Sequence, residues 1–256
     1  HWPELLNRIG LVWVPSDWVK ELFIANGVKT PIFKVGYPVD KNVYIPKRRQ
    51  ESDDPFTVLI WGDGLSTRKN ILEAIKTFLR AELPNAVCQV KISDGIAPRA
   101  GVSWNGKPTG NVFINSESWD RFKLVEWLHS GDVCMYLSGG EGYGLMPKEA
   151  MCTGLPMIVA NNSGMKEYLT PENALLVECP EIEICSTMSA VYYQDLYVAK
   201  PNYDQAVEHL RWAYNNRPAL YEMGWKASQE VSVSTWDDKA LEALYYIEEY
   251  AESIRK

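Results

Sequence analysis

The chain has 256 residues, of which 46% are apolar and 23% charged, and its formal net charge is -7. These values are typical of a globular protein with a sizeable core, and the acidic balance argues against nucleic acid as a partner. No apolar stretch approaches the length of a transmembrane segment. The five cysteines are odd in number and lack metal-like spacing, which predicts reduced thiols, a cytoplasmic protein and no metal site.

The first 54 residues contain one strand and one helix before a charged stretch. Residues 11–15 are mostly apolar, and Ser16 is a suitable cap for a helix over residues 17–26. Residues 47–54 are charged and lack apolar periodicity, so a new domain is expected to begin near Pro55. Because the chain starts with His1 and shows no signal-peptide pattern, we expect a fragment or a processed product.

From Pro55 onward, short apolar runs alternate with helical patterns. This alternation predicts an α/β fold, with a Rossmann-like parallel sheet, helices on both faces and further helices at the C-terminal end. Ligands of such sheets bind outside the carboxyl ends of the strands. The loops 62–69, 114–118 and 139–144 are therefore expected on one rim. The predicted strands are 56–61, 87–92, 112–114 and 132–137, and one predicted helix is 119–130, capped by Ser118.

The loop after the first of these strands carries the adjacent cations Arg68 and Lys69. Asn70 is a suitable helix cap with Glu73 three residues later, so a helix is predicted to begin directly after the basic pair. The pair is either an anion-binding feature or an ordinary solvated pair before a helix. The apolar face of this helix is predicted to comprise Ile71, Ile75, Phe78 and Leu79.

Two glutamates eight positions apart, Glu141 and Glu149, follow the strand 132–137. Pro147 and Gly154 place a short helix at about 145–153, whose N-terminus could bind a phosphate. Glu149 could accept hydrogen bonds from vicinal ribose hydroxyls, and Glu141 from a sugar, so the pattern favours a nucleotide-diphosphate sugar as ligand. The alternative is an ordinary glycine-rich loop of an α/β protein with solvated carboxylates.

These residues resemble the retaining GT-B glycosyltransferases of family 4, whose nucleotide-binding half carries two glutamates separated by seven residues. Residues 141–145 and 149–156 are similar to the family's motifs, and residues 162–167 to the loop that borders its sugar pocket. The resemblance implies that Glu149 binds ribose, that Glu141 binds the donor sugar and that Lys69 faces the diphosphate. The family's arginine has no counterpart, because Gly64 falls near its position. Either Arg68 stands in for it or the phosphates are held less strongly.

The resemblance implies a complete set of site residues. The catalytic group would be Glu141, Lys69 and Arg68, with no metal and no cofactor besides a donor substrate of UDP or GDP type. Trp119 lies near the base-binding loop but is expected to belong to the core. Further donor contacts would come from Glu149, Gly142, Tyr143, Gly144, Leu145, Gly64, Ile114 and Asn115.

The same resemblance divides the chain into three parts. Residues 1–54 would be the remnant of an N-terminal acceptor domain and the interdomain linker, 55–200 the nucleotide-sugar-binding domain, and 201–256 a C-terminal helical segment packed on it. Beyond Glu178 a general helical pattern is expected. The absent part could place the protein at a membrane periphery.

The implied reaction is metal-independent transfer of a sugar, a hexosyltransferase-like activity with retention at the anomeric carbon. The acceptor could be a glycan, a lipid, a protein or a small molecule. Two alternatives stay open: a non-catalytic nucleotide-sugar-binding module or degenerate subunit, and a nucleotide-sugar epimerase.

Overall fold

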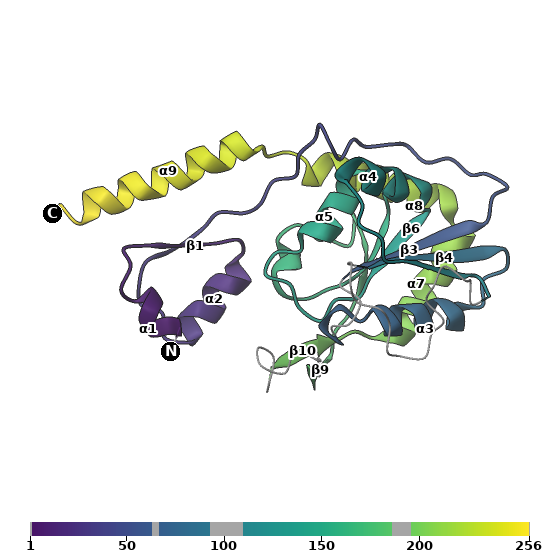
Figure 1. The fold of residues 1–256 in the computed structure, drawn as a ribbon, viewed down its shortest axis with the longest axis horizontal. Coiled ribbons are helices and arrows are strands. Elements are labelled where there is room, and N and C mark those ends of the chain that lie inside the picture. Colours follow the sequence, from purple (N-terminus) through teal and green to yellow (C-terminus); the bar gives the residue numbers. More distant parts are fainter. Residues whose placement is uncertain (1, 63–66, 93–109, 186–195, 256) are drawn as a thin grey trace.

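The main body of the molecule is a parallel sheet of six strands. The computed structural model describes residues 2–62, 67–92, 110–185 and 196–255 (Figure 1). All strand pairs in this sheet are parallel, in the order β5-β4-β3-β6-β7-β8. The α/β prediction is therefore confirmed. The strands are β3 (Phe56–Gly62), β4 (Ala86–Ile92), β5 (Val112–Asn115), β6 (Val133–Tyr136), β7 (Met157–Ala160) and β8 (Leu175–Val177).

Helices cover both faces of the sheet. Because successive residues of a strand point to opposite faces, each strand contributes side chains to both helical layers. Phe56, Val58 and Ile60 of β3 pack with α3 (Ile71–Ala81) and α7 (Tyr203–Asn215). Leu59 packs on the other face with α4 (Arg121–Ser130), α5 (Leu145–Cys152) and α8 (Arg217–Val231). All five cysteines are free thiols.

Two local predictions around these helices were wrong, and a third is confirmed only in part. Asn70 is the N-cap residue of α3 as predicted, but its side chain makes no capping hydrogen bond: the residue adopts a left-handed conformation (φ 53°), and its buried side-chain amide donates to the carbonyl of Leu137 at 2.9 Å. Asp120, not Ser118, caps α4, since its carboxylate accepts from the amide of Lys123 at 2.8 Å. Leu79 is 50% exposed, because it lies beyond the edge of the stripe through Ile71, Ile75 and Phe78.

A β-hairpin was also missed between β8 and α7, where a helical pattern was expected. The strands β9 (Glu181–Ile184) and β10 (Tyr197–Lys200) pair in antiparallel fashion. Glutamate and isoleucine alternate along β9, and this period of two is typical of a strand. Helices do follow from Tyr203 onward. None of the described helices is both long and apolar enough to cross a membrane.

The N-terminal residues form a small separate layer. It consists of α1 (Trp2–Leu6), β1 (Val12–Val14), α2 (Asp17–Ala25) and β2 (Ile32–Lys34), with β1 and β2 parallel. Ser16 caps α2 as predicted, accepting from the amide of Val19 at 3.2 Å. The last helix, α9 (Trp236–Ser253), extends from the sheet toward this layer (Figure 1), where Phe33 and Tyr246 stack with centroids 4.6 Å apart.

Candidate functional site

The candidate site lies where the strand order reverses. From β3 the chain proceeds through β4 to β5 on one side, and from β6 through β7 to β8 on the other. Loops that leave neighbouring strands in opposite directions open a crevice at their carboxyl ends. The 3₁₀ helix η1 (Thr67–Lys69) follows β3, and the glycine-rich loop 138–144 follows β6. The two segments meet directly, since the amide of Gly139 donates to the carbonyl of Arg68 at 2.7 Å.

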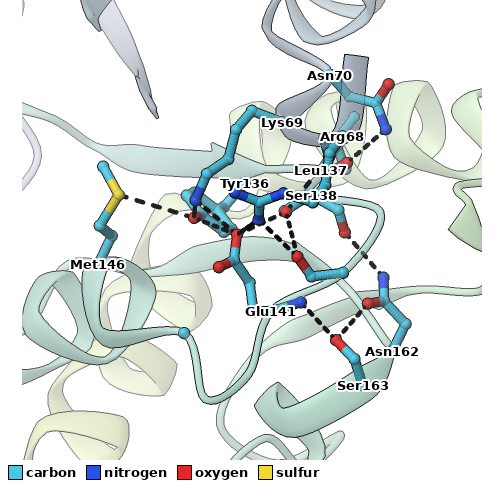
Figure 2. A network of polar contacts seen from close by, with 12 residues as sticks. Arg68, Lys69, Asn70, Tyr136, Leu137, Ser138, Glu141, Met146, Asn162 and Ser163 are labelled. Atoms are coloured by element: carbon cyan, nitrogen blue, oxygen red, sulfur yellow. Dashed lines mark hydrogen bonds and ion pairs between the residues drawn. The ribbon is translucent and has the colours of Figure 1, made fainter. Parts of the chain in front are cut away.

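Glu141 is the centre of a polar network in this crevice (Figure 2). Its Oε1 accepts from Lys69 Nζ at 2.6 Å and from Arg68 Nη1 at 3.0 Å. The same oxygen accepts from the hydroxyls of Tyr136 at 2.9 Å and Ser138 at 2.6 Å. None of the described residues donates to Oε2. The loop after β3 and the loop after β6, 72 positions apart in sequence, are thus joined through one carboxylate oxygen.

The network keeps the buried Glu141 ionised. Burial by itself would raise the pKa of this carboxyl group, but Lys69, the hydroxyl of Ser138 and Arg68 outweigh it and hold the pKa below its ordinary value. Burial and the adjacent carboxylate raise the pKa of Tyr136 well above its usual range, so its phenol remains a hydrogen-bond donor. The site therefore combines two cations and one carboxylate whose side chains are largely buried.

Neighbouring elements fix the backbone that carries Glu141. The amide of Glu141 donates to Ser163 Oγ at 2.8 Å, and the amide of Gly164 donates to the Glu141 carbonyl at 3.0 Å. Both partners belong to the 3₁₀ helix η2 (Ser163–Glu167). From the N-terminal layer, Ser16 Oγ donates to the carbonyl of Gly142 at 2.6 Å. The loop is therefore held from two sides, which favours a preformed site.

Glu149 lies apart from this network, on α5. Tyr44, in the segment between β2 and β3, lies beside it. Burial raises the pKa of Glu149, while its interaction with the hydroxyl of Tyr44 and the charge of Arg121 partly oppose that rise. The second glutamate of the motif is thus a half-buried carboxylate beside Tyr44.

The loop residues between the two glutamates differ in their surroundings. Gly144 precedes α5 with a φ of +82°, where a Cβ would also lie 2.6 Å from a side-chain carbon of Met165, so the fold itself requires glycine. Gly142 is exposed and has room for a Cβ. Tyr143 is buried, whereas Leu145 is partly exposed at the first turn of α5. Gly64 lies outside the described residues.

Ile114 and Asn115 lie at the carboxyl end of β5, on the edge of the sheet. β4 separates them from β3, so they share the rim with the Glu141 network but belong to a different part of it. Asn115 Oδ1 accepts from the amide of Glu117 at 3.0 Å. Trp119 packs against the core as expected, with its ring centroid 5.9 Å from that of Trp127.

Lys148, a buried lysine on α5 next to Glu149, was not predicted from the sequence. Its Nζ donates to the carbonyl of Tyr37 at 2.7 Å and to the hydroxyl of Tyr143 at 2.8 Å. Burial lowers the pKa of Lys148 to about 8. In the sequence, a lysine directly before Glu149 resembles an ordinary solvated residue. The available signal was its spacing of three and four positions from Met151 and Cys152, which places it on the buried side of the helix.

Several solved structures have a fold similar to that of this chain. Sucrose-phosphate synthase from Thermosynechococcus elongatus matches with a TM-score of 0.70 and 17% identity, over 98% of this chain and 61% of that one. Anabaena HepE, solved with UDP and glucose, matches with a TM-score of 0.70 and 17% identity, over 95% and 65%. WaaG, a glycosyltransferase of lipopolysaccharide biosynthesis, matches with a TM-score of 0.63 and 17% identity, over 87% and 58%. The chain thus spans less than two thirds of each of these GT-B proteins.

The sequence comparisons are more specific about the family. No curated protein matches the chain. A family profile described as "Family 4 Glycosyltransferase in conflict systems" matches residues 17–242, which is most of the sequence. The chain therefore belongs to the family 4 glycosyltransferases of conflict systems.

Proposed function

We propose that this chain binds a nucleotide-diphosphate sugar and takes part in the transfer of the sugar to an acceptor, with retention of configuration at the anomeric carbon. The observation that carries the proposal is the convergence of Lys69 and Arg68 with Glu141 at the switch point of the sheet. Two cations suit a diphosphate, and a carboxylate suits sugar hydroxyls. The structure of HepE with UDP and glucose makes a UDP-sugar the first donor to test.

The donor would extend over the network along α5. Lys69, Arg68 and the N-terminus of α5 after Gly144 would hold the diphosphate. The Oε2 of Glu141, to which none of the described residues donates, would accept from the sugar. Because Tyr143 is buried, only the backbone around it would meet the donor. Glu149 would accept from the ribose hydroxyls, with Gly64, Ile114 and Asn115 nearer the base.

In the transfer, the bond between the anomeric carbon and the diphosphate breaks through an oxocarbenium-like transition state. Negative charge then grows on the diphosphate, where Lys69 and Arg68 would stabilise it. Such preorganised electrostatic stabilisation is worth several kcal/mol and does not require a metal ion. Glu141 would orient the sugar rather than attack it, since the four hydrogen bonds to its Oε1 stabilise the anion and weaken the carboxylate as a nucleophile.

Different parts of the chain would have different roles. Residues 55–200 would hold the donor, and 201–256 would pack on that domain. Residues 1–54 would be the remnant of an acceptor-binding domain with its linker. Contacts that support this reading join the layers beside the site, where Lys34 lies 3.0 Å from Glu167 and the amide of Asp17 donates to Glu167 at 2.6 Å.

Calorimetric titration with UDP, GDP, ADP and their common sugar conjugates tests the donor site. Glu149→Ala is expected to weaken binding of the preferred nucleotide by about 1.5–3 kcal/mol, the scale of lost charge-assisted hydrogen bonds. Glu208→Ala, which removes an exposed glutamate on α7, is the control and should bind like wild type. Equal affinity in all three proteins would contradict the assignment, and retained binding without transfer would favour a non-catalytic module.

Donor binding should also weaken as the pH falls from 7.5 to 5. Burial raises the pKa of Glu149, so this carboxyl group takes up a proton at a higher pH than an exposed glutamate and loses acceptor strength for ribose hydroxyls. UDP-glucose is the suitable ligand, because its doubly esterified diphosphate does not titrate in this range. Titration at several pH values should show the decline in wild type and a flatter profile in Glu149→Ala.

A further inference from the structure

An apolar pocket of about 680 Å³ opens beside the Glu141 network. The polar part of its lining includes Arg68, Glu141 and Ser163. The apolar part comes from α2 and from the β9–β10 hairpin, namely Trp18, Leu22, Ile182, Leu196 and Tyr197. The volume lies within the usual range of small-molecule sites.

The hairpin is attached directly to the loop that carries Glu141. The amide of Ala199 donates to the carbonyl of Gly139 at 2.8 Å. A Cβ on Gly139 would lie only 2.6 Å from the carbonyl oxygen of Ala199, so the two backbones approach as closely as glycine permits. Beside them, Thr67 Oγ1 lies 3.5 Å from Cys185 Sγ. The hairpin therefore forms a positioned side of the pocket.

The hairpin leaves large apolar side chains uncovered at this place. Ile182 is 70% exposed and Tyr197 is 65% exposed, and Trp18 and Leu22 face the same pocket from α2. Clustered exposed apolar side chains next to polar groups are typical of a binding site. Against these apolar side chains a sugar would lose hydrogen bonds to water without gaining equivalent bonds from the protein, whereas an alkyl or aromatic group has no such hydrogen bonds to lose.

We propose that the apolar pocket holds the body of the acceptor, and that this acceptor is an amphipathic molecule with a hydroxyl group on an alkyl or aromatic body. The inference rests on the proposed function, because Glu141 and Arg68 at the polar end would hold the donor. The acceptor oxygen forms a bond to the anomeric carbon as the bond from that carbon to the diphosphate breaks. The hydroxyl proton passes to the departing diphosphate.

Two glucosides with the same head group test the pocket. Octyl β-D-glucoside, kept below its micelle-forming concentration, is expected to bind at least about tenfold more tightly than methyl β-D-glucoside, since it adds buried methylene groups. Ile182→Asn should lower the affinity for the octyl compound roughly fivefold. Ile184→Asn is the matched control, because Ile184 is 62% exposed on the same strand but is not among the described lining residues.

Calorimetry of the three proteins with both glucosides, and with UDP, GDP and ADP, separates the outcomes. Selective octyl binding that is reduced only in Ile182→Asn supports the proposal. Equal binding of the two glucosides, no octyl binding, or an equal loss in Ile184→Asn overturns it. The nucleotide titrations report on the donor site alone, so a lack of binding by all three nucleotides contradicts the proposed function and leaves the glucosides to decide the pocket.

Discussion

Replacing Glu141 by alanine is expected to lower the free energy of unfolding by about 3–5 kcal/mol, the usual result of removing one partner of a buried ion pair. The side chains of Lys69 and Glu141 are only 8% and 13% exposed, and their charged atoms are 2.6 Å apart. Loss of the carboxylate leaves the ammonium of Lys69 and the hydroxyls of Tyr136 and Ser138 without their shared acceptor. Urea denaturation followed by circular dichroism measures the change.

An exposed ion pair of the same length provides the control. Lys76 and Glu73 on α3 are also 2.6 Å apart, but their side chains are 53% and 37% exposed. Glu73→Ala should therefore cost at most about 1 kcal/mol. The double variant Glu141→Ala with Lys69→Met should lose less stability than the sum of the single variants, because the two groups are coupled. Equal losses in Glu141→Ala and Glu73→Ala would show that the Glu141 network is not buried in solution.

The sheet could be predicted because its strands are buried on both faces. Residues 56–61 and 132–137 are short apolar runs, and burial between two layers of helices requires such runs. The rule that ligands bind at the carboxyl ends of the strands then placed Lys69 and Glu141 on one rim. Their direct contact could not be predicted, since it depends on β3 and β6 being neighbours in the sheet, and the motifs alone do not state the strand order.

Other features depended on tertiary contacts that outweigh local preferences. Asn70 has the residue type of a side-chain helix cap, yet its side-chain amide donates to the carbonyl of Leu137 after β6. A buried carbonyl requires a hydrogen-bond partner, and this requirement outweighs the local capping preference. Lys148 can be buried because its ammonium donates to the carbonyl of Tyr37, 111 positions away in sequence, as well as to the nearby hydroxyl of Tyr143. The hairpin had a local signal in the alternation along β9, but its contact with Gly139 became evident only in the fold.

Replacing Gly164 by alanine is expected to lower the stability by about 3 kcal/mol, at the upper end of the usual cost of overpacking. A Cβ at this position would lie 2.1 Å from the carbonyl oxygen of Gly142 and 2.9 Å from Ser16 Oγ. The clashing atom belongs to the backbone, which cannot rotate away as a flexible side chain can. The amide of Gly164 also binds the carbonyl of Glu141, so relief of the clash must displace the loop that carries the carboxylate.

Gly142→Ala is the matched control for this variant, because its Cβ would have only an ordinary contact, 3.7 Å from Val19. Scanning calorimetry should show a clear loss of thermal stability for Gly164→Ala and little change for Gly142→Ala. If both unfold alike, the close approach of η2 to the loop 138–144 is not maintained in solution. If Gly142→Ala is stable but binds UDP poorly, the free space at Gly142 is used by the donor, since the fold itself does not need a glycine there.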